Sequence, residues 1–166
     1  MMQMDRILIV SSTEKSRIFF KELMQTPSFQ SASIVENGAE ARRILIEADY
    51  DIIVINAPLS DETGKELALD ITRMTRAGVI LMVKADYTDA VSAKVEDYGV
   101  FVVGKPVNRQ LFYQSLRIVS ASRRRMLIQY LHMTAQNAHR YIEKQAMDLR
   151  MTRREIAEEI LKTYES

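Results

Sequence analysis

The sequence contains no cysteine, which excludes disulfide bonds, thiolate metal sites and cysteine nucleophiles. It holds only two histidines, His132 and His139, too few to form a usual metal site by themselves. No apolar run approaches the roughly 20 residues that span a bilayer, so we expect no membrane span and no membrane partner. A chain without cysteine suits a reducing compartment. We therefore expect a cytoplasmic protein, with no metal and no cofactor.

Glycine and proline are scarce, with five and three residues, and neither occurs after Pro106. The last sixty residues thus lack the strongest helix-breaking residues, and we expect helices separated only by polar turns. Thr152 and Glu155 have the spacing of a capping box. The predicted helices are 108–131, 135–149 and 153–164.

Charge is unevenly distributed although the net charge is only +1. Residues 1–116 hold 13 basic and 16 acidic side chains, whereas residues 117–166 hold 10 and 6. An acidic first part and a basic tail indicate two separate roles, and the basic tail favours a polyanionic partner.

Short apolar runs alternate with helical patterns through the first two-thirds of the chain. The runs are RILIV (6–10), SASIVE (31–36), DIIVIN (51–56), GVILMV (78–83) and VFVV (100–103). Continuous rather than alternating apolar residues indicate strands covered on both faces, as in a parallel sheet. The helical patterns between them cover 13–25, 38–48, 64–75 and 87–98. In the first, Ile18, Phe19, Leu23 and Met24 are predicted to share one side.

This rhythm predicts an α/β fold with right-handed crossovers. Five strands and five helices in about 118 residues favour the flavodoxin-like strand order 2-1-3-4-5, followed by a small three-helix, all-α module. In that order ligands bind at the carboxyl ends of strands 1 and 3. Ser11 and Ser12 follow strand 1 and Asn56 ends strand 3, so these residues mark the first candidate site.

The stretch DIIVINAPLSDETG (51–64), the helix after it and the GKP of 104–106 resemble a response-regulator receiver domain. The resemblance covers roughly residues 4–120, implies a CheY-like fold, and leads us to assign residues 1–120 to this domain. In that family an acidic pair follows strand 1 and a phospho-accepting Asp ends strand 3. These carboxylates hold Mg²⁺ during phosphoryl transfer.

This chain departs from the family pattern at almost every functional position. Serines replace the acidic pair, an amide replaces the acceptor, a lysine replaces the hydroxyl residue of strand 4, and valine replaces the aromatic of strand 5. These residues are Ser11, Ser12, Asn56, Lys84 and Val102, and only Lys105 with Pro106 follows the family. An amide is a poor nucleophile and carries no charge for Mg²⁺, so we expect a degenerate receiver without aspartyl phosphorylation.

Two interpretations of the degenerate site remain open from the sequence. One is a hydrogen-bonded network of Ser11, Ser12 and Asn56, with Lys84 and Lys105 reaching solvent. The other is an anion site formed by the two lysines, with Glu14 or Asp86 as candidate compensating charges.

The tail MLIQYLHMTAQNAHRYIEKQAMDLRMTRREIAEEIL (126–161) is similar to the ANTAR domain, the RNA-binding module of antitermination regulators. The matching positions are Arg124, Met126, Leu127, Ile128, Ala138, Ala146, Met147 and Ala157. Arg123 and Ala135 depart from the family, which usually has Ala at the first position and often Glu at the second. We assign residues 121–166 to this domain, continuous with the long fifth helix.

Basic and aromatic side chains of the tail are candidates for RNA contact. Arginine and lysine neutralise phosphates, and flat rings stack on exposed bases. The candidates are Arg123, Arg124, Arg125, Tyr130, Arg140 and Lys144. Three consecutive arginines spread through about 200° of a helix, so they cannot all face one ligand. The alternative interpretation of this run is an ordinary solvated helix face.

The resemblance implies antitermination through paired hairpin loops in a leader transcript. Two loops favour a homodimer, and loss of phosphorylation favours a regulatory protein partner. The sequence shows no nucleophile–base pair and no acidic dyad, so we do not expect an enzyme. Alternative functions are a protein-interaction adaptor, or a DNA-binding regulator of the response-regulator type. The second is disfavoured because no glycine turn or recognition helix is evident.

Overall fold

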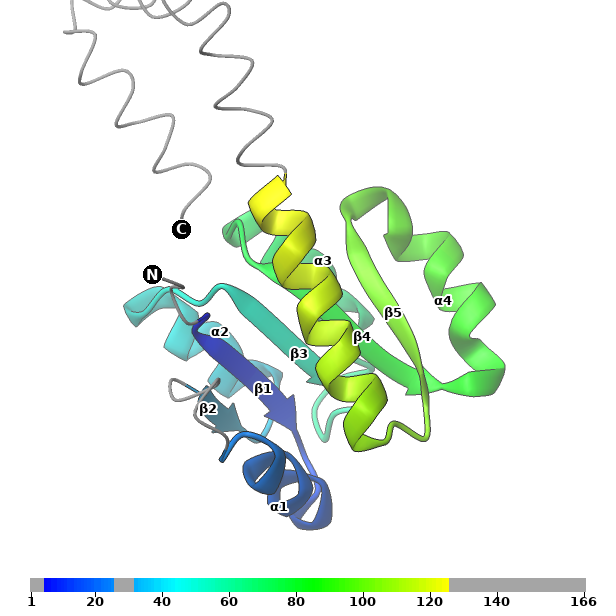
Figure 1. The fold of residues 1–166 in the computed structure, drawn as a ribbon. Coiled ribbons are helices and arrows are strands. Elements are labelled where there is room, and N and C mark those ends of the chain that lie inside the picture. Colours follow the sequence, from blue (N-terminus) through cyan, green and yellow to red (C-terminus); the bar gives the residue numbers. More distant parts are fainter. Residues whose placement is uncertain (1–4, 26–31, 126–166) are drawn as a thin grey trace, which may run out of the picture. The chain divides into compact units, whose positions relative to one another are not determined.

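The computed structural model describes residues 5–25 and 32–125. The chain divides into two compact units, Met1–Ser120 and Ala121–Ser166. The first contains a five-stranded parallel sheet with strand order β2-β1-β3-β4-β5, so the predicted α/β fold and its strand order are confirmed (Figure 1). Its strands are β1 (Ile7–Ser11), β2 (Ala32–Val35), β3 (Ile52–Asn56), β4 (Gly78–Lys84) and β5 (Val100–Lys105).

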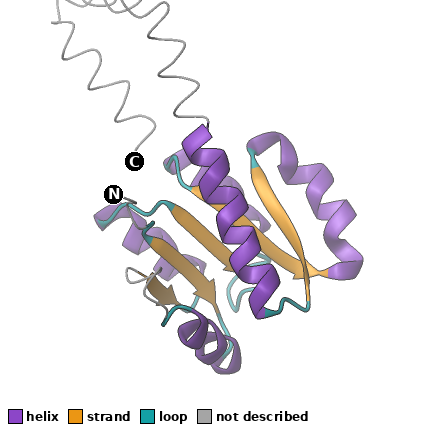
Figure 2. Cartoon of the chain, viewed as in Figure 1, coloured by secondary structure: helices purple, strands orange, loops and turns teal. Residues whose placement is uncertain are grey.

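Helices alternate with these strands (Figure 2). They are α1 (Glu14–Leu23), α2 (Gly38–Glu47), α3 (Lys65–Met74) and α4 (Thr88–Val95), with short 3₁₀ turns η2 (Ala85–Tyr87) and η3 (Glu96–Tyr98) around α4. A further helix, unlabelled in Figure 1, covers 109–125, and we call it helix 109–125. Asn108 caps it, because its side-chain oxygen accepts from the Leu111 amide at 2.7 Å. The helices predicted for 135–149 and 153–164 lie outside the described residues.

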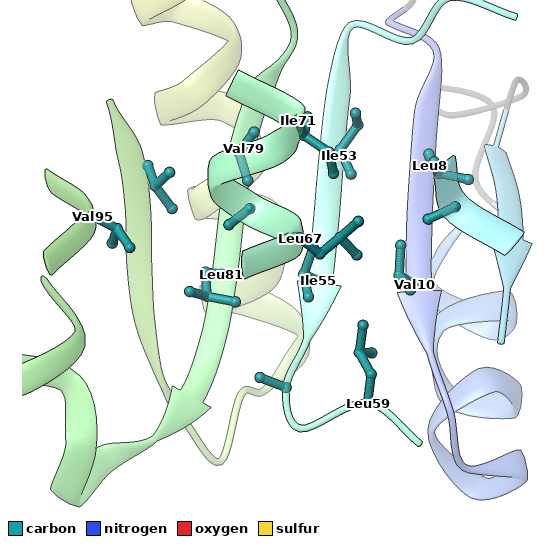
Figure 3. Close-up of a cluster of buried hydrophobic side chains, with 14 of the residues drawn as sticks. Leu8, Val10, Ile53, Ile55, Leu59, Leu67, Ile71, Val79, Leu81 and Val95 are labelled. Carbon is teal, nitrogen blue, oxygen red and sulfur yellow. The ribbon is translucent and has the colours of Figure 1, made fainter. Parts of the chain in front are cut away.

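The sheet is covered on both faces, which explains why its strands are continuously apolar. Alternate strand residues enter two separate hydrophobic clusters. Leu8, Val10, Ile53 and Ile55 belong to the cluster that α2, α3 and α4 cover, drawn in Figure 3. Ile7, Ile9, Ile52 and Val54 belong to the opposite cluster, which α1 and helix 109–125 cover. The parallel strands therefore end together at one edge of a three-layer sandwich.

Helix α1 corrects one prediction from the sequence. Ile18 and Phe19 were predicted on the buried side, but they are 53% and 36% exposed. Phe20 is buried instead, and its ring lies 5.4 Å from that of Phe112, centroid to centroid. Three consecutive apolar residues differ by about 100° each around a helix, so the sequence left the buried face ambiguous. Packing against Phe112 selects Phe20 together with Leu23.

Within residues 5–25 and 32–125, no helix combines the length and the apolar character needed to cross a bilayer.

Candidate functional site

Four strand ends bring polar side chains to the carboxyl edge of the sheet. Ser11 ends β1 and pairs in register with Asn56 at the end of β3. Lys84 ends β4 and pairs in register with Lys105 at the end of β5. The strand order therefore gathers four of the five predicted site residues at one edge, and Ser12 follows directly after β1.

Asn56 stands at the centre of a hydrogen-bonded chain across the sheet. Its Nδ2 donates to Ser11 Oγ at 3.1 Å, and its Oδ1 accepts from Lys105 Nζ at 3.0 Å. Since an ammonium group only donates, the amide oxygen must face Lys105 and the amide nitrogen Ser11. Ser11 is fully buried, so its partnered hydroxyl avoids the cost of an unsatisfied buried polar group.

Lys105 is partly buried and its ammonium group joins the Asn56 network, whereas the network interpretation expected this group to reach solvent. Its side chain extends past β4 to β3, where Nζ donates to Asn56 Oδ1 and to the carbonyl oxygen of Ala57. Burial lowers the pKa of Lys105 from its usual range, and the nearby charge of Lys84 lowers it further. Lys84, in contrast, is exposed, as expected.

Ser12 lies outside the Asn56 network, contrary to the same interpretation. Its hydroxyl donates to the carbonyl oxygen of Glu36 at 2.6 Å and accepts from the Ser60 amide at 2.8 Å. Ser12 therefore joins the end of β2 to the loop after β3. Sequence reasoning missed these partners because both contacts are to backbone atoms, which any residue supplies.

Arg17 is a further residue of this edge that the sequence did not reveal. Its Nη1 donates to the carbonyl oxygens of Ser11 and Ser12 at 3.2 and 2.7 Å, and its Nη2 lies 3.6 Å from a carboxylate oxygen of Glu36. A cation from α1 thus lies against the end of β1, where the receiver resemblance implies a metal-binding acidic pair.

The oxygens present do not fit Mg²⁺. This ion prefers several oxygen ligands in octahedral geometry, with carboxylates among them. Asn56 Oδ1 already accepts from an ammonium group, and the Ser12 hydroxyl is used in two hydrogen bonds. Among residues 5–25 and 32–125 there is no group of three or more His, Cys, Asp or Glu that could hold a metal ion.

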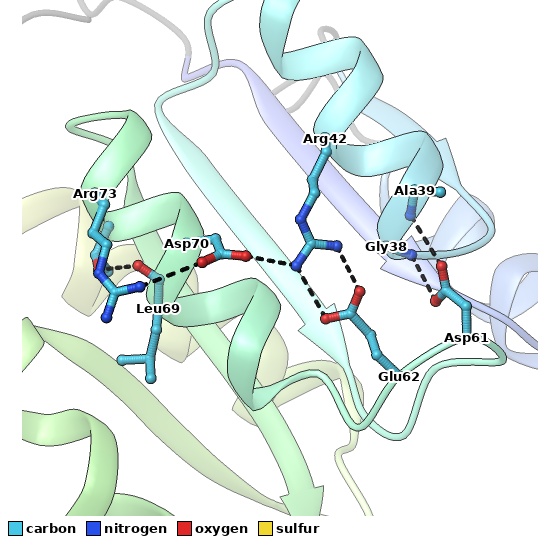
Figure 4. Close-up of polar contacts among 9 residues, drawn as sticks. Gly38, Ala39, Arg42, Asp61, Glu62, Leu69, Asp70 and Arg73 are labelled. Atoms are coloured by element: carbon cyan, nitrogen blue, oxygen red, sulfur yellow. Dashed lines mark hydrogen bonds and ion pairs between the residues drawn. The ribbon is translucent and has the colours of Figure 1, made fainter.

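The loop between β3 and α3 is fastened to α2 by two acidic residues, drawn in Figure 4. The Asp61 carboxylate accepts from the Gly38 and Ala39 amides at 3.0 and 3.1 Å, so it caps the positive end of α2. These amides hold the pKa of Asp61 below its usual range, that of Gly38 most strongly.

Glu62 completes this fastening through Arg42 of α2. The Arg42 guanidinium pairs with Glu62 at 2.6 Å and with Asp70 of α3 at 2.7 Å (Figure 4). Hydrogen bonds to Glu62 and then to Asp70 raise the pKa of Arg42. A Cβ at Gly38 would lie 2.1 Å from a Glu62 oxygen, so a larger residue there would displace the Glu62 side chain. The sequence offered no signal for contacts between residues so far apart.

The predicted RNA-binding residues are only partly described. Arg123 is partly exposed and Arg124 and Arg125 are exposed on helix 109–125. Arg117, seven residues before Arg124, is also exposed. Tyr130, Arg140 and Lys144 lie outside the described residues.

Comparisons with known proteins match one segment of the chain to a family model and also find related folds. The ANTAR domain family matches residues 124–161. The Sensory transduction protein LytR of Staphylococcus saprophyticus is 33% identical over 97 residues, which are 58% of this chain and 38% of that relative. The chain therefore spans little more than a third of that curated relative.

Solved structures match the first part. The signal receiver domain of an HD domain-containing protein from Pseudomonas fluorescens Pf-5 is 21% identical, with a TM-score of 0.62, over 72% of this chain and 89% of that one. The chemotaxis response regulator CheY4 of Vibrio cholerae is 16% identical, with a TM-score of 0.63, over 70% and 99%. The first unit thus has the CheY-like receiver fold. Together these findings support a receiver-type fold joined to an ANTAR segment.

Proposed function

We propose that this protein is a transcription antitermination regulator that binds RNA through its ANTAR segment and receives its input through the receiver-type unit. The match of residues 124–161 to the ANTAR family carries this proposal. The basic balance of residues 117–166 supports it, because RNA is a polyanion. The input role belongs to residues before about residue 120, and the RNA-binding role to residues after it. The function is regulatory rather than catalytic.

The RNA partner is a pair of hairpin loops in a nascent leader transcript. Binding stabilises these loops and thereby prevents the terminator hairpin from forming. Arg124 and Arg125, exposed where the ANTAR match begins, neutralise phosphates, and Arg123, Tyr130, Arg140 and Lys144 complete the proposed RNA surface. Because the target has two loops, a homodimer presents one module to each.

The receiver-type unit works without aspartyl phosphorylation. Asn56 replaces a nucleophilic carboxylate, and its amide oxygen accepts from the Lys105 ammonium group. Ser11 and Ser12 offer hydroxyls in place of metal-binding carboxylates, and both hydroxyls already have partners. Input then comes from a regulatory protein partner or another non-covalent signal. The sensory role in the name of the staphylococcal relative agrees with a signalling function.

A salt-titrated gel shift with the full-length chain tests the output. The probes are the leader RNA upstream of the neighbouring operon, the same RNA with one loop scrambled, and the matching duplex DNA. We expect tight, loop-dependent RNA binding that weakens steeply with salt. Equal binding to the scrambled RNA contradicts loop recognition. Preference for the duplex indicates the DNA-binding alternative, and no nucleic-acid binding at moderate salt indicates the adaptor.

A further inference from the structure

Two lysines lie side by side where β4 and β5 end. Lys84 and Lys105 are paired in register on neighbouring strands, whose backbones lie about 4.8 Å apart in a sheet. Lys84 is exposed and Lys105 is partly buried. Burial lowers the pKa of Lys105, and the like charge of Lys84 lowers it further.

Two groups of this edge carry more hydrogen-bond donors than their hydrogen bonds to the described residues use. The Lys105 ammonium has three N–H groups, and two of them reach Asn56 Oδ1 and the Ala57 carbonyl oxygen. Asn56 Nδ2 carries two hydrogens, and one reaches Ser11 Oγ. One donor on each group therefore remains available, besides the three of the exposed Lys84.

No carboxylate of the described ranges 5–25 and 32–125 forms an ion pair with either lysine. The two candidates from the sequence, Glu14 and Asp86, form none. Asp61 and Glu62 of the neighbouring loop contact α2 instead, through the Gly38 and Ala39 amides and Arg42. Positive charge and unpaired donors thus coincide at this edge without a described acidic partner.

We propose that Lys84 and Lys105, together with the Asn56 amide, bind a small free oxyanion of the phosphate class. The anion binds without a metal and without a covalent bond to the chain. Its negative charge offsets the repulsion between the lysines, and its oxygens accept from the available donors. This inference goes beyond the proposed function and does not depend on RNA binding.

Inorganic phosphate is the probe, titrated into the full-length, ¹⁵N-labelled chain against chloride at constant ionic strength. We expect saturable shifts of the backbone amides at Lys84, Gly104 and Lys105, with no saturable shift at Gly99 at the other end of β5. Lys84→Met should weaken the apparent phosphate affinity about tenfold or more, since a hydrogen bond to a charged group is lost. Because Lys84 is exposed, this variant should keep the fold.

Lys94→Met is the matched control, because Lys94 is an exposed lysine on α4. It should bind phosphate as the unmodified chain does, and Lys84→Arg should restore most of the affinity. The midpoint of thermal unfolding gives a second measurement, since a ligand specific for the folded state raises it with concentration. Phosphate also stabilises proteins by exclusion from their surface. Two results would overturn the proposal. One is a phosphate-induced rise of the unfolding midpoint that is equally large in Lys84→Met and in the unmodified chain, and the other is the absence of a localised, saturable amide shift.

Discussion

At the level of single residues, the Asn56 amide determines the hydrogen bonds of its neighbours. A carboxylate at this position would pair with Lys105, whereas the amide accepts from Lys105 and donates to Ser11. The amide therefore links β5, β3 and β1 into one hydrogen-bonded chain. The sequence predicted that Asn56 ends the third strand because four apolar residues precede it, and the structure confirms this. It did not reveal the course of the Lys105 side chain, which depends on a long, flexible stem.

Two glycines allow the cost of a left-handed backbone to be separated from the cost of crowding. Gly64 and Gly99 both have positive φ, +97° and +81°. A Cβ at Gly99 meets nothing within 4 Å, whereas at Gly64 it would lie 3.0 Å from the Ala57 Cβ. We expect Gly99→Ala to lower the free energy of unfolding by about 1 kcal/mol. Gly64→Ala should lower it by more, measured by urea denaturation. Equal losses would show that crowding at Gly64 is relieved by small movements.

Asp61 should give the stability of the first unit a specific dependence on acid. Its pKa is lowered in the folded state, so its stabilisation is present above the unfolded value of about 3.9. That stabilisation is lost as the pH falls through the still lower folded pKa. Asp61→Asn should therefore be less stable than the unmodified chain near neutral pH, and the difference should shrink below about pH 3.9.

Urea denaturation of both proteins across this pH range measures the effect. Asp89→Asn is a suitable control, because Asp89 is an exposed acidic residue in the first turn of α4. If the difference between Asp61→Asn and the unmodified chain stayed constant with pH, the cap on α2 would not depend on the Asp61 charge.

At the scale of elements, strands were easier to predict than the orientation of helices. Residues 7–10 of β1 and 52–55 of β3 are all buried, so each of these positions carries the same apolar signal. Helix α1 offers three adjacent apolar residues, and only tertiary packing decides which is buried. The conformation of the loop after β3 could not be predicted, because it depends on contacts of Asp61 and Glu62 with α2 across 23 and 20 residues.

Phe112 should hold helix 109–125 against the sheet. It is fully buried and packs against Phe20. Phe112→Ala should lower the free energy of unfolding by about 3–5 kcal/mol, because it removes a buried ring and leaves a cavity.

Phe19→Ala is the matched control, since Phe19 is 36% exposed on α1. Its cost should be clearly smaller in the same urea or thermal denaturation experiment. A similar loss in both variants would contradict the assignment of the buried face of α1.

At the scale of the whole molecule, the two parts of the chain differ in how much the sequence alone could predict. The ANTAR resemblance stated from residues 126–161 agrees with a family match over 124–161. The RNA-contacting residues stay a prediction, since Tyr130, Arg140 and Lys144 lie outside the described residues. Charge and family resemblance can indicate a surface for RNA, but they do not fix which side chains meet phosphates.

Arg124 should contribute to RNA binding through phosphate neutralisation. Arg124→Ala should weaken binding to the leader RNA and reduce the slope of log affinity against log salt by about 0.7 to 0.9. Lys94→Ala, an exposed position on α4, should leave both quantities unchanged. An unchanged salt slope in Arg124→Ala would remove Arg124 from the RNA surface.

Regulation without phosphorylation is tested most simply by the dissociation constant for the leader RNA, measured with and without a small phosphodonor. Full-length protein in Mg²⁺ is treated with acetyl phosphate, or with matched acetate and inorganic phosphate, so that free anions affect both samples equally. We expect tight, loop-dependent binding with the same dissociation constant in both samples. The contradicting result has two parts. Acetyl phosphate alone would lower the dissociation constant of the unmodified chain about tenfold or more, and it would leave that of Asn56→Ala unchanged. Such a result would show that the receiver-type unit depends on phosphorylation that requires Asn56.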